Sequence, residues 1–460
     1  MQNSHSAARL RVLVCAFACS PGGGPASLAG GGEAVLGWNI VRQLARFHEV
    51  VVLTHAELRS AIESGLKEAF NGNIHFHYLK LPRWLEALKG FAGGIQFYAY
   101  LWQIKAYFVA RRLHRERPFD VFHHVTYAND WMASYIGALL PVPYIRGPGG
   151  GAQRVPKAFL AGFSRRGRFW EHVRSVGQQV LRHDPIFMLG QRRARAILVC
   201  TPESLFTIPE RWRTKAQLFP VNGITSEDLR LTERNNRADS PTRVWPHENG
   251  QFNGSQKPFR VLSAGKLLEL KAFDLAIRAF QLFVQKAPTA TFTLIGDGPE
   301  SGRLRKLTQE LGLDGKVRIE KWMSREELLQ AMAQSDVFLF ASLRDGGGAV
   351  VIEAMAAGMP VVCLDHAGPA MHVTEKCGIK VQPRHPDQAI KEMAEALFCL
   401  YRDAELRLQM GKAARERAER SYHWERHGDC LLEVYRRVLH VEGDLPARSS
   451  EHAESIATTS

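Results

Sequence analysis

A glycine-rich loop lies between two acidic residues in the C-terminal half of the chain. Asp345 precedes the three glycines Gly346, Gly347 and Gly348, and Glu353 follows them in a segment of helical apolar spacing. An apolar run at residues 337–342 comes directly before the loop, so the predicted order is strand, loop and helix. Glycine lets backbone N–H groups approach a ligand closely, and a helix N-terminus carries partial positive charge. The pattern predicts a site for an anionic ligand such as a nucleotide; an ordinary buried strand–helix unit is the alternative.

Strands and helices are predicted to alternate in two halves of the chain, which a polar stretch separates. This stretch, residues 232–257, is rich in Asn, Arg, Ser and Pro and has almost no apolar periodicity. We therefore predict an N-terminal Rossmann-like α/β domain at residues 1–231, a linker at 232–257 and a C-terminal Rossmann-like α/β domain at 258–441. The last helices of the second domain are free to pack back on the first, and a disordered tail is expected at 442–460.

Short apolar runs in both halves are predicted to form strands. These runs are residues 11–17, 50–54, 74–79, 120–125, 143–146, 196–201 and 217–221 in the first half, and 260–264, 291–295, 317–320, 337–341 and 360–364 in the second. Parallel sheets of this kind bind ligands at the carboxyl ends of their strands, so a cleft between two such units is the expected active site.

Composition and motifs argue against several classes of protein. The first glycine-rich loop, residues 20–33, does not fit the Gly-x-Gly-x-x-Gly fingerprint, and no acid ends the strand that follows, which argues against a dehydrogenase. The seven cysteines are scattered without metal-ligand spacing, which favours a reducing cytosol. Residues 1–8 are polar, so no signal peptide is expected, and no apolar run is long enough to span a bilayer.

A net charge of +14 is compatible with phosphate-bearing partners or an anionic membrane surface, and a generally basic solvated surface is the alternative. The region Arg165–Arg195 is strongly basic and has aromatic residues among its arginines, so it is predicted to contact an anionic membrane. Nucleic acid is not expected as a partner, because no recognition motif accompanies the charge. The aromatic segment Leu81–Arg117 is predicted to form core-packing helices, with docking on lipid headgroups as the alternative.

The motifs of this chain resemble those of the family 4 glycosyltransferases, retaining enzymes of GT-B architecture that use nucleotide-sugar donors. The family signature is an acid, seven residues, a glutamate and then AMAAGxPVV, which matches residues 345–362. Other matching motifs are the glycine loop at 30–33, Pro-x-Asn-Gly-Ile at 220–224, the strand end with Gly265, Lys266 and Lys271, and Gly-x-Gly-Pro at 296–299. The resemblance covers residues 11–441 and implies two facing Rossmann-like domains with a cleft between them.

The resemblance implies a role for the matched residues. Glu353 would accept hydrogen bonds from the donor ribose, while Asp345 and the backbone of the glycine loop would hold the transferred sugar. Two lysines at the mouth of a strand, together with N–H groups at a helix start, can neutralise a diphosphate without a metal ion. We therefore expect no metal and no cofactor beyond the nucleotide-sugar co-substrate. The expected donor-binding residues are Gly31, Gly32, Gly265, Lys266, Lys271, Gly296, Trp322, Met323, Asp345, Gly346, Gly347, Gly348, Ala349, Val350 and Glu353.

Two neighbouring histidines end the predicted strand at residues 120–125. A histidine at this place contacts the donor sugar in the family, so both are candidates, with His124 preferred; a structural role is the alternative. The expected catalytic residues are His124, His123, Asp345, Lys266 and Lys271. For Trp322 in the expected base pocket, packing is preferred over stacking.

Two positions depart from the family pattern. Asp345 replaces the usual glutamate, so its carboxylate reaches less far toward a sugar. Lys266 replaces the usual arginine, which loses bidentate geometry on a phosphate. Neither change removes the charge that the site needs.

The resemblance implies a hexosyl- or related glycosyltransferase that retains anomeric configuration and acts on a glycan or lipid-linked acceptor in cell-envelope or exopolysaccharide biosynthesis. A catalytically inactive GT-B module that binds a nucleotide or sugar, and a nucleotide-sugar epimerase, are the alternatives. The protein is expected in the cytoplasm, with peripheral association at the inner face of the membrane.

Overall fold

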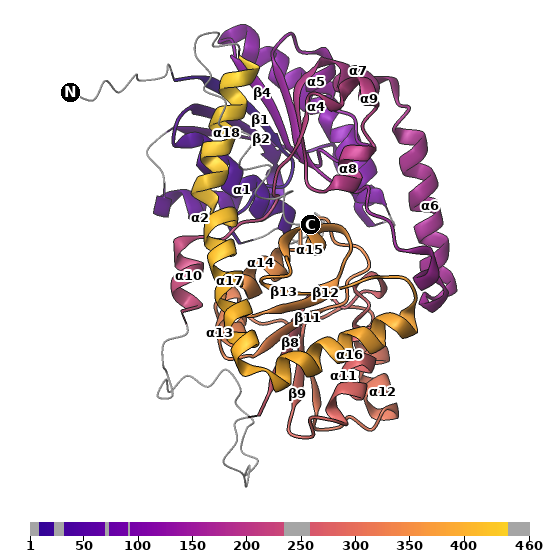
Figure 1. Cartoon of the computed structure of the whole chain (residues 1–460). Coiled ribbons are helices and arrows are strands. Elements are labelled where there is room, and N and C mark those ends of the chain that lie inside the picture. The colour runs from indigo at the N-terminus through magenta and orange to yellow at the C-terminus, as the bar shows by residue number, and fades with distance from the viewer. Residues whose placement is uncertain (1–8, 23–31, 70–72, 91–92, 234–257, 440–460) are drawn as a thin grey trace, which may run out of the picture. The chain divides into compact units, whose positions relative to one another are not determined.

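The computed structural model describes residues 9–22, 32–69, 73–90, 93–233 and 258–439 (Figure 1). The chain forms two compact units, each assembled from segments that are separated in the sequence. Among the described residues, unit 1 takes those up to 152, residues 172–221 and residues 424–439, and unit 2 takes residues 153–171, 222–233 and 258–423. Each unit is an α/β fold around a parallel sheet, as predicted from the sequence.

Within the described residues, unit 1 contains a seven-stranded parallel sheet in the order β3-β2-β1-β4-β5-β6-β7. The strands are β1 (Arg11–Ala16), β2 (Glu49–His55), β3 (Ile74–Leu79), β4 (Val121–Thr126), β5 (Tyr144–Gly149), β6 (Ala194–Val199) and β7 (Ala216–Leu218). Every residue of β4 and β5 is buried, which is typical of a parallel sheet covered on both faces. The strand order reverses between β1 and β4.

Helices of unit 1 lie beside its sheet (Figure 1). They are α1 (Gly32–Ala45), η2 (Ala56–Leu58), α2 (Arg59–Ala69), α3 (Arg83–Glu86), η3 (Ala87–Gly90), α4 (Gly94–Glu116), α5 (Tyr135–Leu139), α7 (Pro185–Arg193), α8 (Pro202–Phe206), α9 (Glu210–Arg213) and α18 (Trp424–Val438). The helix α6 (Arg165–Leu181) contributes residues to both units.

Unit 2 contains a six-stranded parallel sheet among the described residues, in the order β10-β9-β8-β11-β12-β13. Its strands are β8 (Arg260–Ala264), β9 (Thr291–Ile295), β10 (Val317–Glu320), β11 (Val337–Phe340), β12 (Val361–Leu364) and β13 (Gly378–Val381). Its helices are η4 (Lys157–Gly162), α10 (Ser226–Leu231), η5 (Glu269–Lys271), α11 (Phe273–Val284), α12 (Ser301–Glu310), α13 (Arg325–Ala333), α14 (Ala349–Ala356), α15 (Ala367–His372), α16 (Pro386–Arg402) and α17 (Ala404–Tyr422). One apolar core includes α11 and α16, and a second includes α13, α14 and α17.

The domain boundaries differ from those predicted. Helix α18 belongs to unit 1, in line with the expectation that the last helices are free to pack back on the first domain, because Leu431 and Val434 are buried in the core of that unit. Residues 153–171 belong to unit 2, where Phe159 is part of the core. Residues 222–231 also belong to unit 2. The predicted linker beyond Glu233 and the predicted tail at 442–460 lie outside the described residues.

The aromatic segment at residues 81–117 packs into the core on one face only. Tyr98, Trp102 and Leu113 on α4 are buried, and Trp102 Nε1 donates a hydrogen bond to the Leu79 carbonyl at 3.1 Å. Phe108 on the opposite face of α4 is exposed. The prediction of core-packing helices is therefore correct for one face and wrong for the other.

No helix among the described residues has both the length and the apolar character that crossing a membrane requires. The seven cysteines all fall within the described residues and are free thiols. Burial raises the pKa of Cys15 and Cys363 far above the ordinary value, so these thiols stay protonated and pack as small apolar groups.

Candidate functional site

The strand order of unit 2 reverses between β8 and β11, which are paired neighbours. Ligands of such sheets bind where the order reverses, at the carboxyl ends of the strands. The loop after β8 carries Lys266 and leads to Lys271, and the loop after β11 carries Asp345. The N–H of Leu343 donates to the Leu270 carbonyl at 2.9 Å and ties the two loops together. The fold thus gathers candidates from distant parts of the sequence at one edge.

Lys271 and Asp345 form an ion pair between these two loops. Lys271 Nζ lies 2.5 Å from Asp345 Oδ2, and both side chains are largely shielded from solvent. Burial alone would raise the pKa of Asp345, but the Lys271 ammonium and the loop N–H groups outweigh burial, so the pKa lies below its ordinary value. An anionic ligand would have to share the ammonium with Asp345 or displace this carboxylate.

The other oxygen of Asp345 organises the glycine loop. Asp345 Oδ1 accepts hydrogen bonds from the N–H groups of Gly347 at 3.1 Å and Gly348 at 2.8 Å. Gly348 has a φ of +53°, and a Cβ there would lie 2.8 Å from the ring of His372, so only glycine fits this position without strain. The resemblance predicts that these N–H groups hold the transferred sugar. In this structure Asp345 already accepts hydrogen bonds from the N–H groups of Gly347 and Gly348, so their contact with a sugar stays a prediction.

Helix α14 begins directly after this loop. Gly348 is its N-cap, and the N–H groups of Val351 and Ile352 donate to the Gly348 carbonyl at 2.9 and 3.2 Å. In the part of the chain that the structure describes, no acceptor is recorded for the N–H groups of Ala349 and Val350. These groups can therefore donate to an anion that meets the positive end of the helix, as the sequence predicts.

Glu353 lies further along α14 and is buried. The guanidinium of Arg325 forms an ion pair with Glu353 Oε1, and Arg325 Nε donates to Asp228 Oδ1 at 3.0 Å. Burial raises the pKa of Glu353 above its ordinary value, and Arg325 opposes that shift. Arg325 therefore engages Oε1 of Glu353, the carboxylate that is expected to accept a hydrogen bond from the donor ribose.

Three more predicted residues lie in loops at the same edge. Lys266 is exposed, and within the described residues its ammonium has no recorded ion pair. Trp322, in the loop after β10, is 62% exposed, so the prediction that it packs in the core is wrong. Met323 is half-buried against the core that includes α14. An exposed indole offers a flat surface on which a planar ring can stack.

The loop after β9 supports the loop that carries the lysines. The Gly265 N–H donates to the Ile295 carbonyl at 3.0 Å, and the Leu267 N–H donates to the Asp297 carbonyl at 2.9 Å. A Cβ on Gly296 would lie 1.9 Å from the Gly265 carbonyl oxygen. The two backbones are in direct contact, which any side chain at residue 296 would prevent.

Replacing Gly296 by alanine is expected to destabilise unit 2 by roughly 2–4 kcal/mol, because the new Cβ would push the Gly265 carbonyl and the lysine loop away. Thermal unfolding of the full chain measures the effect. Gly302→Ala is the matched control, since a Cβ there meets no atom within 4 Å. Equal melting temperatures for the two variants would contradict the expectation.

The two predicted histidines are both buried in unit 1. His123 Nδ1 lies 2.8 Å from the Tyr435 hydroxyl and Nε2 lies 2.6 Å from the Gly147 carbonyl oxygen, while burial lowers the pKa of His123 to about 4. Burial, with a smaller contribution from Arg146, lowers the pKa of His124 to about 3. The structure therefore shows two neutral, enclosed imidazoles, which does not support direct contact with a donor, and their catalytic role stays a prediction.

The N-terminal glycine loop leads into α1. Gly31 lies outside the described residues, and Gly32 is the exposed first residue of the helix. Glu33 Oε1 accepts a hydrogen bond of 2.6 Å from the N–H of Tyr127, a residue with a φ of +57° in the loop after β4. Glu33 thereby connects the start of α1 to the carboxyl end of β4, where the strand order of unit 1 reverses.

Arg325 and His372 contribute to the unit 2 site without a sequence signal. His372 Nε2 lies 2.9 Å from the Gly347 carbonyl oxygen, and Nδ1 lies 2.9 Å from the Tyr422 hydroxyl. Burial lowers the pKa of His372 to about 4, so the ring supports the loop as a neutral group. Neither residue belongs to a motif, because both act through contacts with residues far away in the sequence.

The C-terminal half of the chain is similar to known glycosyltransferases. Residues 247–417 match the family model described as "Glycosyl transferases group 1". The D-inositol 3-phosphate glycosyltransferase of Saccharomonospora viridis is 29% identical over 185 residues, which cover 38% of this chain and 42% of that protein. The lipopolysaccharide core biosynthesis glycosyltransferase LpsE of Rhizobium meliloti is 36% identical over 109 residues, which cover 24% of this chain and 30% of that protein. The matched stretches thus span less than half the length of these relatives.

A solved structure shares the fold over nearly the whole chain. Anabaena HepE in complex with UDP superposes with a TM-score of 0.59 at 17% identity and covers 92% of this chain and 99% of that one. The two α/β units with parallel sheets therefore have the GT-B glycosyltransferase fold, which confirms the fold class predicted from the sequence.

Proposed function

We propose that this protein is a glycosyltransferase that moves a sugar from a nucleotide-sugar donor to a glycan or lipid-linked acceptor. The observation that carries the proposal is the edge of unit 2 at which Lys271, Asp345 and the start of α14 meet. A cation, free helix N–H groups and a buried carboxylate one turn further on match the diphosphate and ribose of such a donor. The match of residues 247–417 to the group 1 glycosyltransferase model supports the same conclusion.

Each part of the donor has a partner in this arrangement. Lys271, Lys266 and the N–H groups that begin α14 bind the diphosphate, and Glu353 accepts a hydrogen bond from the ribose. The indole of Trp322 stacks on the base. HepE binds UDP, so uridine diphosphate sugars are the first donors to test.

Transfer proceeds with retention by attack on the front face. The acceptor hydroxyl oxygen bonds to the anomeric carbon on the side from which the diphosphate departs, and the bond from that carbon to the diphosphate oxygen breaks. The hydroxyl proton passes to an oxygen of the leaving diphosphate. Lys271 and the helix N–H groups stabilise the charge that develops on this leaving group.

Unit 1 supplies the acceptor side, and the sugar transferred is a hexose or a related sugar. LpsE acts in lipopolysaccharide core biosynthesis, which supports an envelope or exopolysaccharide glycan as the acceptor class. The protein works in the cytoplasm at the inner face of the membrane.

A screen of nucleotide sugars with the purified full chain tests the proposal. We expect one donor to raise the melting temperature and to release its nucleoside diphosphate slowly without an acceptor. A ligand at a hundred times its Kd stabilises a protein by about 2.7 kcal/mol, which a thermal shift detects readily. Release of no diphosphate from any donor, together with no shift, would contradict a donor site.

The alternatives give different products in the same screen. An inactive binding module shows the thermal shift without any release of diphosphate. An epimerase converts the nucleotide sugar into a stereoisomer, which nuclear magnetic resonance of the reaction mixture identifies.

Helix α6 supports association with an anionic membrane. Its large apolar side chains recur every three or four residues along one side and are exposed: Phe169, Val173, Val176 and Val180. Gln178, on the opposite side, is buried, and Arg174 Nη2 there donates to the Gly151 carbonyl at 2.6 Å. The helix therefore turns polar groups inward and apolar groups outward, which is the pattern of a helix that lies in a membrane interface.

Replacing Arg165 and Arg166 by glutamine is expected to weaken binding to anionic vesicles by roughly 25-fold, because each basic residue near such a surface contributes about a factor of five. Arg168 is left unchanged because its guanidinium donates to the Phe163 carbonyl at 3.0 Å. Co-sedimentation at rising salt measures the binding, which should fall steeply. Binding that does not respond to salt would contradict electrostatic association.

A further inference from the structure

The chain leaves unit 1 after β5, contributes residues 153–171 to unit 2 and then returns to unit 1 along α6. These residues, here called the crossing segment, include η4 and the start of α6. Phe159 and Phe163 are buried in the apolar core of unit 2 that also contains Leu267 and Leu343. Because Leu267 and Leu343 belong to the loops after β8 and β11, the crossing segment shares a core with the two loops that carry the candidate donor residues.

The start of α6 is fixed to the loop that carries the lysines. The Ser164 N–H donates to Glu269 Oε1 at 3.1 Å, and the Arg168 N–H donates to the Ser164 carbonyl at 2.9 Å in the first turn of the helix. Glu269 lies in η5, two residues before Lys271. A Cβ on Gly167 would lie 1.9 Å from Glu269 Oε2, so glycine lets the helix lie directly against this carboxylate. The positive end of the helix dipole stabilises a negative charge at this place.

The far end of the crossing segment is fixed to the loop after β11. Glu171 forms an ion pair with Arg344, which directly precedes Asp345 in the chain. Both side chains of the pair are largely shielded from solvent, so salt screens their attraction less than it would at the surface. The pair therefore restrains the backbone next to Asp345.

A third contact of the crossing segment reaches the loop after β12. His366 Nε2 lies 2.9 Å from the Arg154 carbonyl oxygen. Two residues further on, the Gly368 N–H donates to the Asp345 carbonyl at 2.8 Å. The crossing segment thus contacts the loops that follow β8, β11 and β12, which are neighbours in the sheet of unit 2.

We propose that the crossing segment positions the ion pair of Lys271 and Asp345 for sugar transfer, with Glu171 and Arg344 as positioning residues. This inference rests on the proposed function, because it assigns the segment a role in that reaction. The Lys271 ammonium stabilises the leaving diphosphate fully only when it is held at the right place. The contact of Ser164 holds the loop of Lys271, and the contact of Glu171 holds the loop of Asp345, so one segment fixes both members of the pair.

Hydrogen exchange of the full chain tests the positioning without any donor. The N–H groups of Gly347 and Gly348 donate to Asp345 Oδ1, so their exchange reports how firmly the loop is held. Glu171→Gln should speed exchange in a peptide that covers residues 343–350 by roughly fivefold, the effect of losing one favourable ion pair. Unchanged exchange in this peptide would overturn the proposal.

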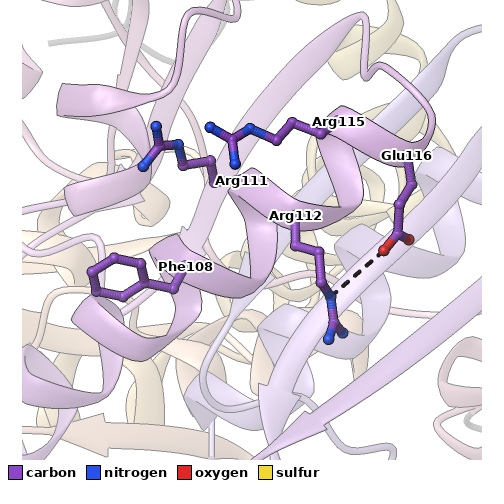
Figure 2. A pocket seen from close by; sticks show the side chains of 5 residues that line it. All are labelled: Phe108, Arg111, Arg112, Arg115 and Glu116. Atoms are coloured by element: carbon purple, nitrogen blue, oxygen red, sulfur yellow. Dashed lines mark ion pairs between the residues drawn. The ribbon is translucent and has the colours of Figure 1, made fainter.

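Two controls match the loss of a carboxylate. Glu49→Gln removes one with similar shielding, since the side chain of Glu49 is 19% and that of Glu171 15% exposed. Glu116→Gln removes the same charge from a more exposed place, and Figure 2 shows Glu116 paired with Arg112 at the end of α4, where Nε and Oε1 lie 3.7 Å apart. Neither control should change the exchange of residues 343–350.

Kinetics with the donor found in the screen test the consequence for catalysis. Glu171→Gln should lower kcat by roughly 10- to 100-fold, because a small misplacement of a group that acts on the reacting atoms has an effect of this size. The KM for the donor should change by less than about threefold, since Glu353 still binds the ribose. In a Lys271→Ala background, Glu171→Gln should lower kcat by less than about twofold more, because it acts through this lysine.

The outcomes separate this inference from the proposed function. An unaltered protein that releases no diphosphate from any donor would contradict the proposed function, and faster exchange in Glu171→Gln would then still support the hold of the crossing segment on the loop. An active protein whose kcat is the same in Glu171→Gln would overturn the positioning role alone. Losses that multiply when Glu171→Gln and Lys271→Ala are combined would also overturn it, because they would show a general loss of folded protein.

Discussion

Replacing Lys271 by alanine is expected to lower the rate of sugar transfer by roughly a hundred- to a thousandfold, the usual effect of removing one group that stabilises developing charge. The Lys271 ammonium is held 2.5 Å from Asp345 at the edge where β8 and β11 end, so it is already positioned before a donor arrives. Steady-state release of nucleoside diphosphate with the donor found in the screen measures the effect. The loss should appear mainly in kcat, because the charge on the diphosphate grows as it leaves.

The same substitution leaves Asp345 buried without its partner, so a loss of stability must be separated from a loss of catalysis. Removing one member of a shielded ion pair is destabilising, and the pKa of Asp345 would rise toward the value that burial favours. Thermal unfolding should therefore be recorded beside the kinetics. Lys271→Arg keeps the cation and should recover part of the rate, whereas Lys306→Ala, on the exposed side of α12, should match the unaltered protein. A Lys271→Ala variant that is folded and fully active would exclude Lys271 from the donor site.

Replacing Glu353 by glutamine is expected to weaken nucleotide binding by roughly 10- to 100-fold, because a hydrogen bond to a charged acceptor is worth about 1.5–3 kcal/mol. The carboxylate is buried, and Arg325 engages its Oε1, so the acceptor expected for the ribose is held in place. Glutamine has nearly the same shape but carries no charge for Arg325. Calorimetric titration with the nucleoside diphosphate measures the affinity without any catalytic step.

The control for Glu353 is Glu310→Gln, which removes an exposed carboxylate from α12 and should not change affinity. A second variant, Arg325→Met, removes the group that opposes the raised pKa of Glu353. Nucleotide binding by that variant should weaken as the pH falls toward the acidic range, because Glu353 then binds a proton more readily. Undiminished nucleotide affinity in Glu353→Gln would show that the ribose binds elsewhere.

The sequence by itself determined the alternation of strands and helices and the location of the glycine-rich loop before α14. A short apolar run predicts β1 closely, because a strand covered on both faces needs apolar side chains at nearly every position. The bounds of β3, in which apolar residues alternate with histidines, also match those predicted. The acid and glycines before α14 predict the loop, because glycine adopts the positive φ of Gly348 more readily than other residues. These features depend on neighbours in the chain, so a single sequence displays them.

The tertiary structure determined the features that depend on contacts between residues far apart in the sequence. Strand β13 has only half-buried central residues, which gives too weak an apolar run to predict. The apolar stripe of α18 shows that one side is buried but does not identify unit 1 as its partner. Helix α4 has aromatic residues on both sides, and only packing shows that Tyr98 is enclosed while Phe108 is exposed.

For the candidate site as well, the sequence predicts which residues take part, and the tertiary structure determines their partners. Motif spacing predicts Lys271, Asp345 and Glu353 as site residues, whereas the ion pair of Lys271 with Asp345 and the contact of Glu353 with Arg325 depend on the strand order. Asp345 accepts hydrogen bonds from two backbone N–H groups of its own loop, and the motif does not reveal these contacts. Periodicity and spacing record which positions are apolar, acidic or flexible, whereas the partner of a buried charge is set by the order in which the strands assemble.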